Sequence, residues 1–128
     1  LESFVEERGR IARFYDGALA SAPDIAPLAI PEGCRSSYYK YIALLEEGVD
    51  RTVLKKRLRE EWDVGLSGEV YELPCHKQPI FEGMGGDGAF PVAEDICRRH
   101  VCLPLYQGMS EEEMGRVVSG ITEVLSTM

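Results

Sequence analysis

Apolar residues recur with helical spacing at both ends of the chain. In residues 2–20 one stripe contains Ile11, Tyr15, Ala18 and Leu19, which predicts an amphipathic helix. A second helix begins after Ser110, because Ser110 and Glu113 match a capping box. Its apolar stripe is Met114, Val117, Val118, Ile121 and Leu125. The chain therefore begins and ends in helices that each need an apolar surface to pack against.

The middle of the chain changes to a strand-like pattern. Residues 37–45, SYYKYIALL, are dense in tyrosine and aliphatic side chains, which predicts a strand whose apolar end is buried on both faces. Asp50 then caps a helix to about Trp62, with Leu58 on its apolar face and Gly65 as the left-handed residue that stops it.

The remaining segments alternate between extended and helical character. Residues 69–73 and 101–105 read as short strands, and residues 91–100 as a short helix that starts with proline. Residues 21–31 hold three prolines and predict an extended connection, whereas residues 74–90 are irregular. This order permits a parallel βαβ domain but favours an α+β layer, in which helices pack on a small sheet.

Length and charge exclude several classes of protein. The 128 residues suggest one domain, and 14 basic against 22 acidic residues give a net charge of −8. This charge argues against nucleic acid or an anionic membrane as the main partner. No apolar run approaches the roughly 20 residues that span a bilayer. The charged first residues contain no signal peptide, and the four cysteines are too few to staple the chain, so we expect reduced thiols and a cytoplasmic location.

The start of the sequence predicts a longer parent protein. The chain has no initiator methionine, and its first helix has no N-cap residue. We therefore expect these 128 residues to be part of a larger chain.

Two short motifs are better explained by structure than by ligand binding. Gly83, Gly85 and Gly88 satisfy G-x-G-x-x-G, but no buried strand precedes them and no helix starts within them. Such glycines favour a surface loop over a dinucleotide site. The basic run Lys55, Lys56, Arg57 and Arg59 is followed at once by acidic residues, which favours a solvated helix face over a phosphate site.

Histidine and cysteine offer one functional candidate. A zinc set could be imagined from Cys75, His76, Cys97, His100 and Cys102, but its spacing matches no recognised pattern, so we expect no metal. His100 ends a helix, where it suits the helix dipole. His76 lies in a loop among prolines, where a histidine is the type of residue that carries function. The alternative is a surface-loop histidine with no role.

Three segments, taken in order, resemble the carboxy-terminal domain of the DegT/DnrJ/EryC1/StrS aminotransferases. Residues 36–66, SSYYKYIALLEEGVDRTVLKKRLREEWDVGL, are similar to the family's aromatic strand and following helix. Residues 68–81, GEVYELPCHKQPIF, resemble its tyrosine–proline–histidine–glutamine–proline loop. Residues 90–118, FPVAEDICRRHVCLPLYQGMSEEEMGRVV, resemble its final helix, Leu-Pro strand and capped helix. The segment IARFYDGAL, residues 11–19, is similar to the helix that leaves the family's large domain.

The resemblance implies a fold and a place in a larger enzyme. The family consists of pyridoxal-phosphate (PLP) enzymes of fold type I that aminate keto-sugars, usually nucleotide-linked. The expected fold is α+β: a small, mostly antiparallel sheet of about three strands with helices packed on it. Residues 1–20 would form a linking helix, 21–36 a proline-rich connection and 37–128 the core of one small domain. The implied partners are the amino-terminal PLP-binding domain, a second subunit in a homodimer, a nucleotide-sugar substrate and an amino-acid donor.

The resemblance also implies which residues approach the substrate. His76, Gln78 and Tyr39 would contact the sugar when the small domain closes the cleft. No catalytic residue is expected in this chain, because none of its lysines (Lys40, Lys55, Lys56 and Lys77) stands in the family's Schiff-base context. The chain alone is therefore expected to be inactive and to bind no PLP. Residues 82–89 depart from the family pattern, so the resemblance does not identify which sugar is the substrate. The alternatives are a non-catalytic interaction module of this fold and a small Cys/His metal-binding protein.

Overall fold

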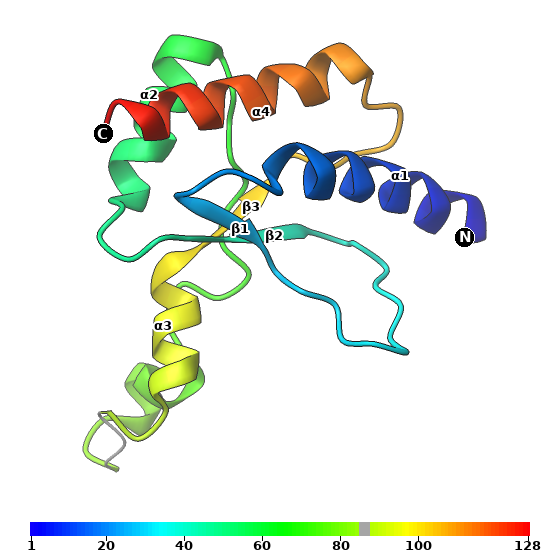
Figure 1. Cartoon of the computed structure of the whole chain (residues 1–128). Coiled ribbons are helices and arrows are strands. Elements are labelled where there is room, and N and C mark those ends of the chain that lie inside the picture. Colours follow the sequence, from blue (N-terminus) through cyan, green and yellow to red (C-terminus); the bar gives the residue numbers. More distant parts are fainter. Residues whose placement is uncertain (85–87) are drawn as a thin grey trace.

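A three-stranded antiparallel sheet lies at the centre of the chain, in the order β1, β2, β3 (Figure 1). The computed structural model describes residues 1–84 and 88–128. The strands are β1 (Ile25–Pro27), β2 (Tyr41–Leu45) and β3 (His100–Leu103). The helices are α1 (Glu2–Leu19), α2 (Arg51–Trp62), α3 (Pro91–Arg99) and α4 (Glu111–Ser126), with two 3₁₀ turns, η1 (Cys75–Lys77) and η2 (Pro79–Phe81). The α+β prediction is confirmed.

Helices α1, α2 and α4 form a layer over one face of the sheet (Figure 1), and α4 packs against both of the others. Most residues of their predicted apolar stripes are buried, although Ala18 of the α1 stripe is exposed. Together with β2 these helices make one core. Its fully buried members include Ile11, Tyr15, Ala43, Leu54, Leu58, Met114 and Ile121. The helical periodicity in the sequence therefore identified the packing surface of each helix.

Both predicted helix starts are confirmed by their caps. Asp50 Oδ1 accepts hydrogen bonds from the N–H groups of Thr52 and Val53, at 2.8 and 3.1 Å. At α4 the Ser110 hydroxyl accepts from the Glu113 N–H, and the Glu113 carboxylate accepts from the Ser110 N–H in return. These bonds satisfy amide groups that have no partner within the helix.

The third strand is not where the sequence predicted it. It is β1, inside the segment expected to be only a connection, and it pairs with β2 so that Ile25 lies opposite Leu45. A strand containing a proline is tolerated at the edge of a sheet, where the missing N–H is not needed. Pro27 is the last residue of this edge strand, which is why the prolines did not prevent pairing.

The predicted strand at residues 69–73 is wrong. Only Ser67 pairs with β3, through one isolated antiparallel bridge to Cys102. Beyond it, the Val70 N–H donates to His100 Nε2 at 3.0 Å instead of to a neighbouring strand. The Glu69 carboxylate is drawn to Lys55 on α2, at 2.9 Å. The Val70 amide and the Glu69 carboxylate therefore bond to side chains, and this segment does not join the sheet as a strand.

Strand β2 is shorter than predicted. Tyr38 has a left-handed φ of 46°, so the backbone turns before the strand begins at Tyr41. Tyr39 consequently lies outside the strand and shares no strand face with Tyr41. Burial alternates along β2, with its even-numbered residues half-exposed, rather than covering both faces.

The stop of α2 also differs from the expectation. The left-handed residue is Asp63, with φ 52°, and not Gly65. The Val64 N–H then bonds the Leu58 carbonyl at 3.0 Å. Aspartate adopts this conformation more readily than most residues, so a polar residue can replace the glycine that usually follows a helix.

Leu58→Ala tests the packing of α2. Leu58 is fully buried, so its truncation should lower the free energy of unfolding by about 2–5 kcal/mol through lost burial and the cavity left behind. Val53 is 42% exposed on the same helix, and Val53→Ala should cost less than about 1 kcal/mol. Urea denaturation of both variants measures the difference, and equal losses would contradict the assigned register.

Two glycines of α4 form a matched pair. A Cβ added at Gly120 would lie 2.9 Å from Trp62 Cγ and 3.2 Å from Leu58 Cδ2, whereas one added at Gly115 meets nothing within 4 Å. We expect Gly120→Ala to destabilise the fold by about 1–3 kcal/mol through overpacking. Gly115→Ala should stabilise it by about 0.5–1 kcal/mol, because alanine favours the helix. Thermal melts of the two variants should shift in opposite directions.

Candidate functional site

The segment that contains His76 folds as a separate lobe. Residues 73–84 and 88–99, here called the histidine lobe, extend from the end of the sheet away from the layer of α1, α2 and α4 (Figure 1). Two prolines shape its backbone: Pro74 precedes η1 and Pro79 is the first residue of η2. Gln78 lies between the turns with φ −65° and ψ 145°, the extended conformation that a following proline imposes.

His76 is held at its edge and at its face. Its Nε2 lies 2.9 Å from Glu94 Oε1, and its ring packs on Phe90 with the ring centroids 4.9 Å apart. The side chain is 12% exposed. Both contacting residues belong to α3 or its N-terminal boundary, so this helix fixes the orientation of the imidazole.

The Glu94 carboxylate is a shared acceptor. Besides His76, it accepts from Lys77 Nζ on Oε2 at 2.9 Å and from the Gly88 N–H on Oε1 at 3.1 Å. The hydrogen bond from Lys77, followed by that from His76, lowers the pKa of Glu94 below its usual value. Glu94 is therefore ionised at neutral pH and joins three points of the lobe.

The structure brings two of the three expected substrate residues together. His76 and Gln78 line one open hollow, and the Gln78 amide nitrogen donates to the Leu73 carbonyl at 3.2 Å. His76 and Phe81 also border a second, mainly apolar hollow. Its other lining residues are Cys75, Met84, Phe90 and Ala93. The imidazole thus stands between a polar and an apolar surface.

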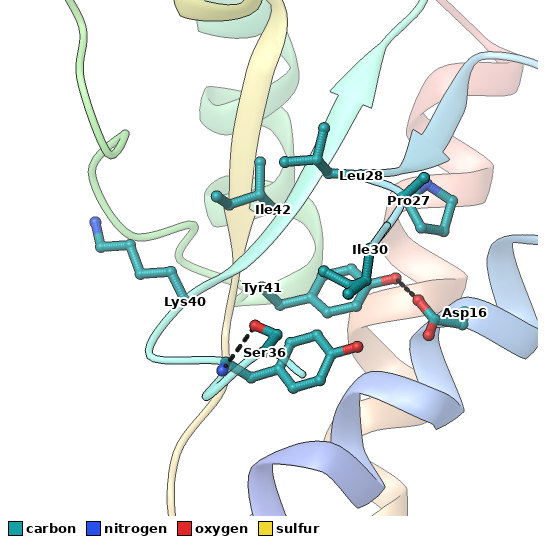
Figure 2. Close-up of a pocket in the computed structure, with 10 residues that line it drawn as sticks. Asp16, Pro27, Leu28, Ile30, Ser36, Lys40, Tyr41 and Ile42 are labelled. Carbon is teal, nitrogen blue, oxygen red and sulfur yellow. Dashed lines mark hydrogen bonds between the residues drawn. The ribbon is translucent and has the colours of Figure 1, made fainter. Parts of the chain in front are cut away.

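Tyr39 is not part of this arrangement. Its side chain is 60% exposed and borders neither hollow of the histidine lobe. The neighbouring tyrosines line a different hollow, between α1 and the segment that follows β1. Figure 2 shows the Tyr41 hydroxyl directed at Asp16, to which it donates at 2.7 Å. Burial, and then this bond to Asp16, raises the pKa of Tyr41, so the phenol stays protonated.

Sequence reasoning missed Glu94, Phe90 and Asp16. Glu94 could have been found, because a helix that starts at Pro91 places it in the first turn, next to the preceding loop. Asp16 gave no such signal, since its partner Tyr41 is 25 residues away. Tyr38, which also borders the Asp16 hollow, adopts its left-handed φ with its N–H bonded to Ser36 Oγ at 3.0 Å.

His100 belongs to the core and not to the site. Its side chain is buried, its Nδ1 lies 2.7 Å from the Ile96 carbonyl, and its Nε2 accepts the Val70 N–H. A ring nitrogen that accepts from an amide carries no proton, so Nδ1 must be the donor. His100 is therefore neutral and closes the C-terminal end of α3.

The metal-site and glycine-motif candidates of the sequence form no site of their own among the described residues. Among the described residues no group of three or more His, Cys, Asp or Glu side chains is placed to hold a metal ion. Gly83 and Gly88 have positive φ, and Gly85 of the glycine motif lies outside the described residues. In the part of the chain that the structure describes, no helix is both long and apolar enough to cross a membrane.

The lysines occupy surface positions. Lys55 and Lys77 donate to carboxylates and Lys40 donates to the Gly68 carbonyl at 2.6 Å, while Lys56 is exposed. A lysine that forms a Schiff base needs a desolvated or cation-flanked pocket. None of the four lysines has one.

Comparison with known proteins gives one consistent result. The chain is 32% identical to the dTDP-4-dehydro-2,3,6-trideoxy-D-glucose 4-aminotransferase of Saccharopolyspora spinosa, over 91% of this chain and 29% of that protein. It is 25% identical to the spore coat polysaccharide biosynthesis protein SpsC of Bacillus subtilis, over 98% of this chain and 33% of that protein. The crystal structure of the aminotransferase TlmJ from Streptoalloteichus hindustanus superposes with a TM-score of 0.82 at 28% identity, covering 99% of this chain and 33% of that one.

The chain thus spans about a third of the length of these relatives. A sequence profile of the DegT/DnrJ/EryC1/StrS aminotransferase family matches residues 1–122, almost the entire chain. The fold and the sequence agree, and the chain belongs to the DegT/DnrJ/EryC1/StrS aminotransferase family.

Proposed function

We propose that this chain is the carboxy-terminal, cleft-closing domain of a PLP-dependent aminotransferase. Its proposed substrate is a keto-sugar linked to a nucleotide. The observation that carries the proposal is the family match over residues 1–122 in a chain one third as long as its relatives. Two relatives support the substrate class: one is named for a dTDP-linked dehydro-sugar and the other for polysaccharide biosynthesis.

The histidine lobe supplies the sugar-contacting wall in this proposal. His76 and Gln78 present ring nitrogens and an amide beside one hollow, and these groups donate to and accept from sugar hydroxyls. The apolar side of His76, with Phe81 and Phe90, suits the carbon face of a sugar or a deoxy position. Tyr39, exposed and outside both hollows, remains a third proposed contact, made when the domain closes on its parent.

The cofactor chemistry belongs to the rest of the protein. PLP supplies the electron sink through which an amino group passes from an amino-acid donor to the sugar. Lys56 and Lys77 are exposed, and the half-buried Lys40 and Lys55 donate to a carbonyl and a carboxylate, so the residues present do not fit a Schiff-base site. We therefore assign PLP binding to an amino-terminal domain of the parent chain, and infer that these 128 residues alone are inactive.

The proposal includes a setting for the whole enzyme. We infer a homodimer in which the small domain moves against the PLP-binding domain, in the cytoplasm, where nucleotide sugars are used. Residues 1–20 would link the two domains, and because α1 packs into the same core as the rest of the chain, it would move together with residues 21–128. The net charge of −8 supports neither a nucleic-acid nor a membrane partner.

The absence of a cofactor lysine can be tested on this chain directly. Incubation with PLP, treatment with borohydride and peptide mass mapping should give no stoichiometric adduct on any lysine. The physical reason is that exposed ammonium groups are protonated at neutral pH and form only transient imines. One lysine modified in near-unit yield, and still modified after dialysis before reduction, would refute the assignment of the cofactor to another domain.

His76→Ala tests the sugar wall in the full-length protein. The side chain makes no core contacts, so the melting temperature should change little. Loss of one hydrogen bond to a bound group costs about 1–3 kcal/mol, which lowers kcat/KM for the keto-sugar roughly five- to a hundredfold. The half-reaction with the amino-acid donor should be much less affected, and Lys56→Ala serves as an exposed control. Equal losses in both half-reactions would point to the cofactor, and no loss in either would remove His76 from the site.

A further inference from the structure

We propose that Glu94 is the positioning residue of the histidine lobe, and that it sets which ligand groups His76 can recognise. In this arrangement Glu94 holds the proton of the His76 ring on Nε2, so Nδ1 is an acceptor and selects a hydrogen-bond donor such as a sugar hydroxyl. The identity of the ligand as a sugar rests on the proposed function, whereas the position of the proton on the His76 ring is independent of it.

The geometry assigns the proton between the two side chains. His76 Nε2 and Glu94 Oε1 are 2.9 Å apart. An ionised carboxylate can only accept, and two further donors, Lys77 Nζ and the Gly88 N–H, converge on the same group. The hydrogen bond must therefore run from Nε2–H to Glu94, which leaves no choice of tautomer for a neutral ring.

The other ring nitrogen is left for a ligand. Nδ1 of His76 makes no hydrogen bond to any residue that the structure describes, and no buried nitrogen or oxygen of the described side chains lacks a partner. Within the described part of the chain, Nδ1 is therefore the ring nitrogen that no protein group occupies. A lone pair in this position accepts from hydroxyl or N–H groups and repels phosphate oxygens.

Lys77 contacts the same carboxylate that holds His76. A lone carboxylate beside a histidine favours the imidazolium, in which both nitrogens donate. Here the Lys77 ammonium lies 2.9 Å from the second oxygen of Glu94 and offsets its charge. Among the described residues, Glu82 also borders the hollow that His76 lines. An imidazolium at this site would instead suit a phosphate, so the two states predict different ligands.

Helix α3 carries both contacts of the ring. Glu94 is in its first turn and Phe90 is its N-terminal boundary residue, so the helix holds the ring by its edge and by its face. No residue of the histidine lobe except Pro74 is buried. Polar bonds to Glu94, and not an apolar core, therefore fix the direction of His76.

Nitrogen-15 spectroscopy of the two imidazoles tests the tautomer directly. The chain has only two histidines, and the structure gives them opposite tautomers, with the proton on Nε2 in His76 and on Nδ1 in His100. Long-range ¹H–¹⁵N spectra at pH 7.5 should show these two patterns, with His100 as the internal reference. A slowly exchanging Nε2–H proton of His76 should vanish in Glu94→Ala and persist in Glu60→Ala, which removes an exposed carboxylate. An imidazolium or an Nδ1–H tautomer at His76 would overturn the proposal.

Kinetics of the full-length protein test the consequence for the ligand. Glu94→Ala should lower kcat/KM for the keto-sugar about two- to tenfold, the scale of one neutral hydrogen bond. Glu94→Gln keeps an oxygen that accepts from Nε2–H, so it should restore the value to within about twofold. Inorganic phosphate should not compete at millimolar concentration. If His76→Ala lowers kcat/KM and Glu94→Ala does not, the positioning role of Glu94 is wrong while the proposed function stands. If the wild-type protein has no aminotransferase activity, the proposed function is wrong, and the tautomer is still tested by the spectra.

Discussion

Three strands of three to five residues cannot form a stable sheet alone. Their apolar side chains must be covered, and here one layer of three helices covers them from a single side (Figure 1). Helix α4 is central to that layer because it contacts both α1 and α2. The close approach at Gly120, where Trp62 and Leu58 occupy the space of a side chain, shows how tightly α2 and α4 meet. The rest of the architecture depends on this contact.

The histidine lobe is stabilised in another way. It contributes almost nothing to the core, and its exposed apolar residues include Ile80, Met84 and Val92. Prolines restrict its backbone, and Glu94 joins its turns by charged hydrogen bonds. Regions with few buried apolar contacts open at low free energy. The chain thus combines a rigid helical layer with a lobe whose shape depends on a few polar contacts.

The sequence predicted the helix starts and most of the buried helix faces, which depend on nearby residues, although it misplaced the end of α2 and the start of β2. Helical periodicity, the Asp50 cap and the Ser110 capping box depend on residues within four positions of each other, and all are confirmed. Prediction from the sequence failed where a residue far along the chain determines the local structure. The Val70 amide bonds His100, 30 residues away, instead of forming a strand. Pro27 ends a strand that exists only because β2 pairs with it. Of the site, the sequence located the His76 and Gln78 loop, but the Glu94 contact required the fold.

The bridge between Ser67 and Cys102 brings the two ends of the lobe-bearing segment together beside the sheet. The segment between them leaves the sheet after Ser67 and returns to it at β3, close to the same place. A segment with adjacent ends can change in length at a small entropic cost, because loop-closure entropy grows only slowly with length. The helical layer and sheet could therefore be retained while this excursion is exchanged or extended. Under the proposed function, the sugar contacts of this segment could therefore change while the core that stabilises the domain stays the same.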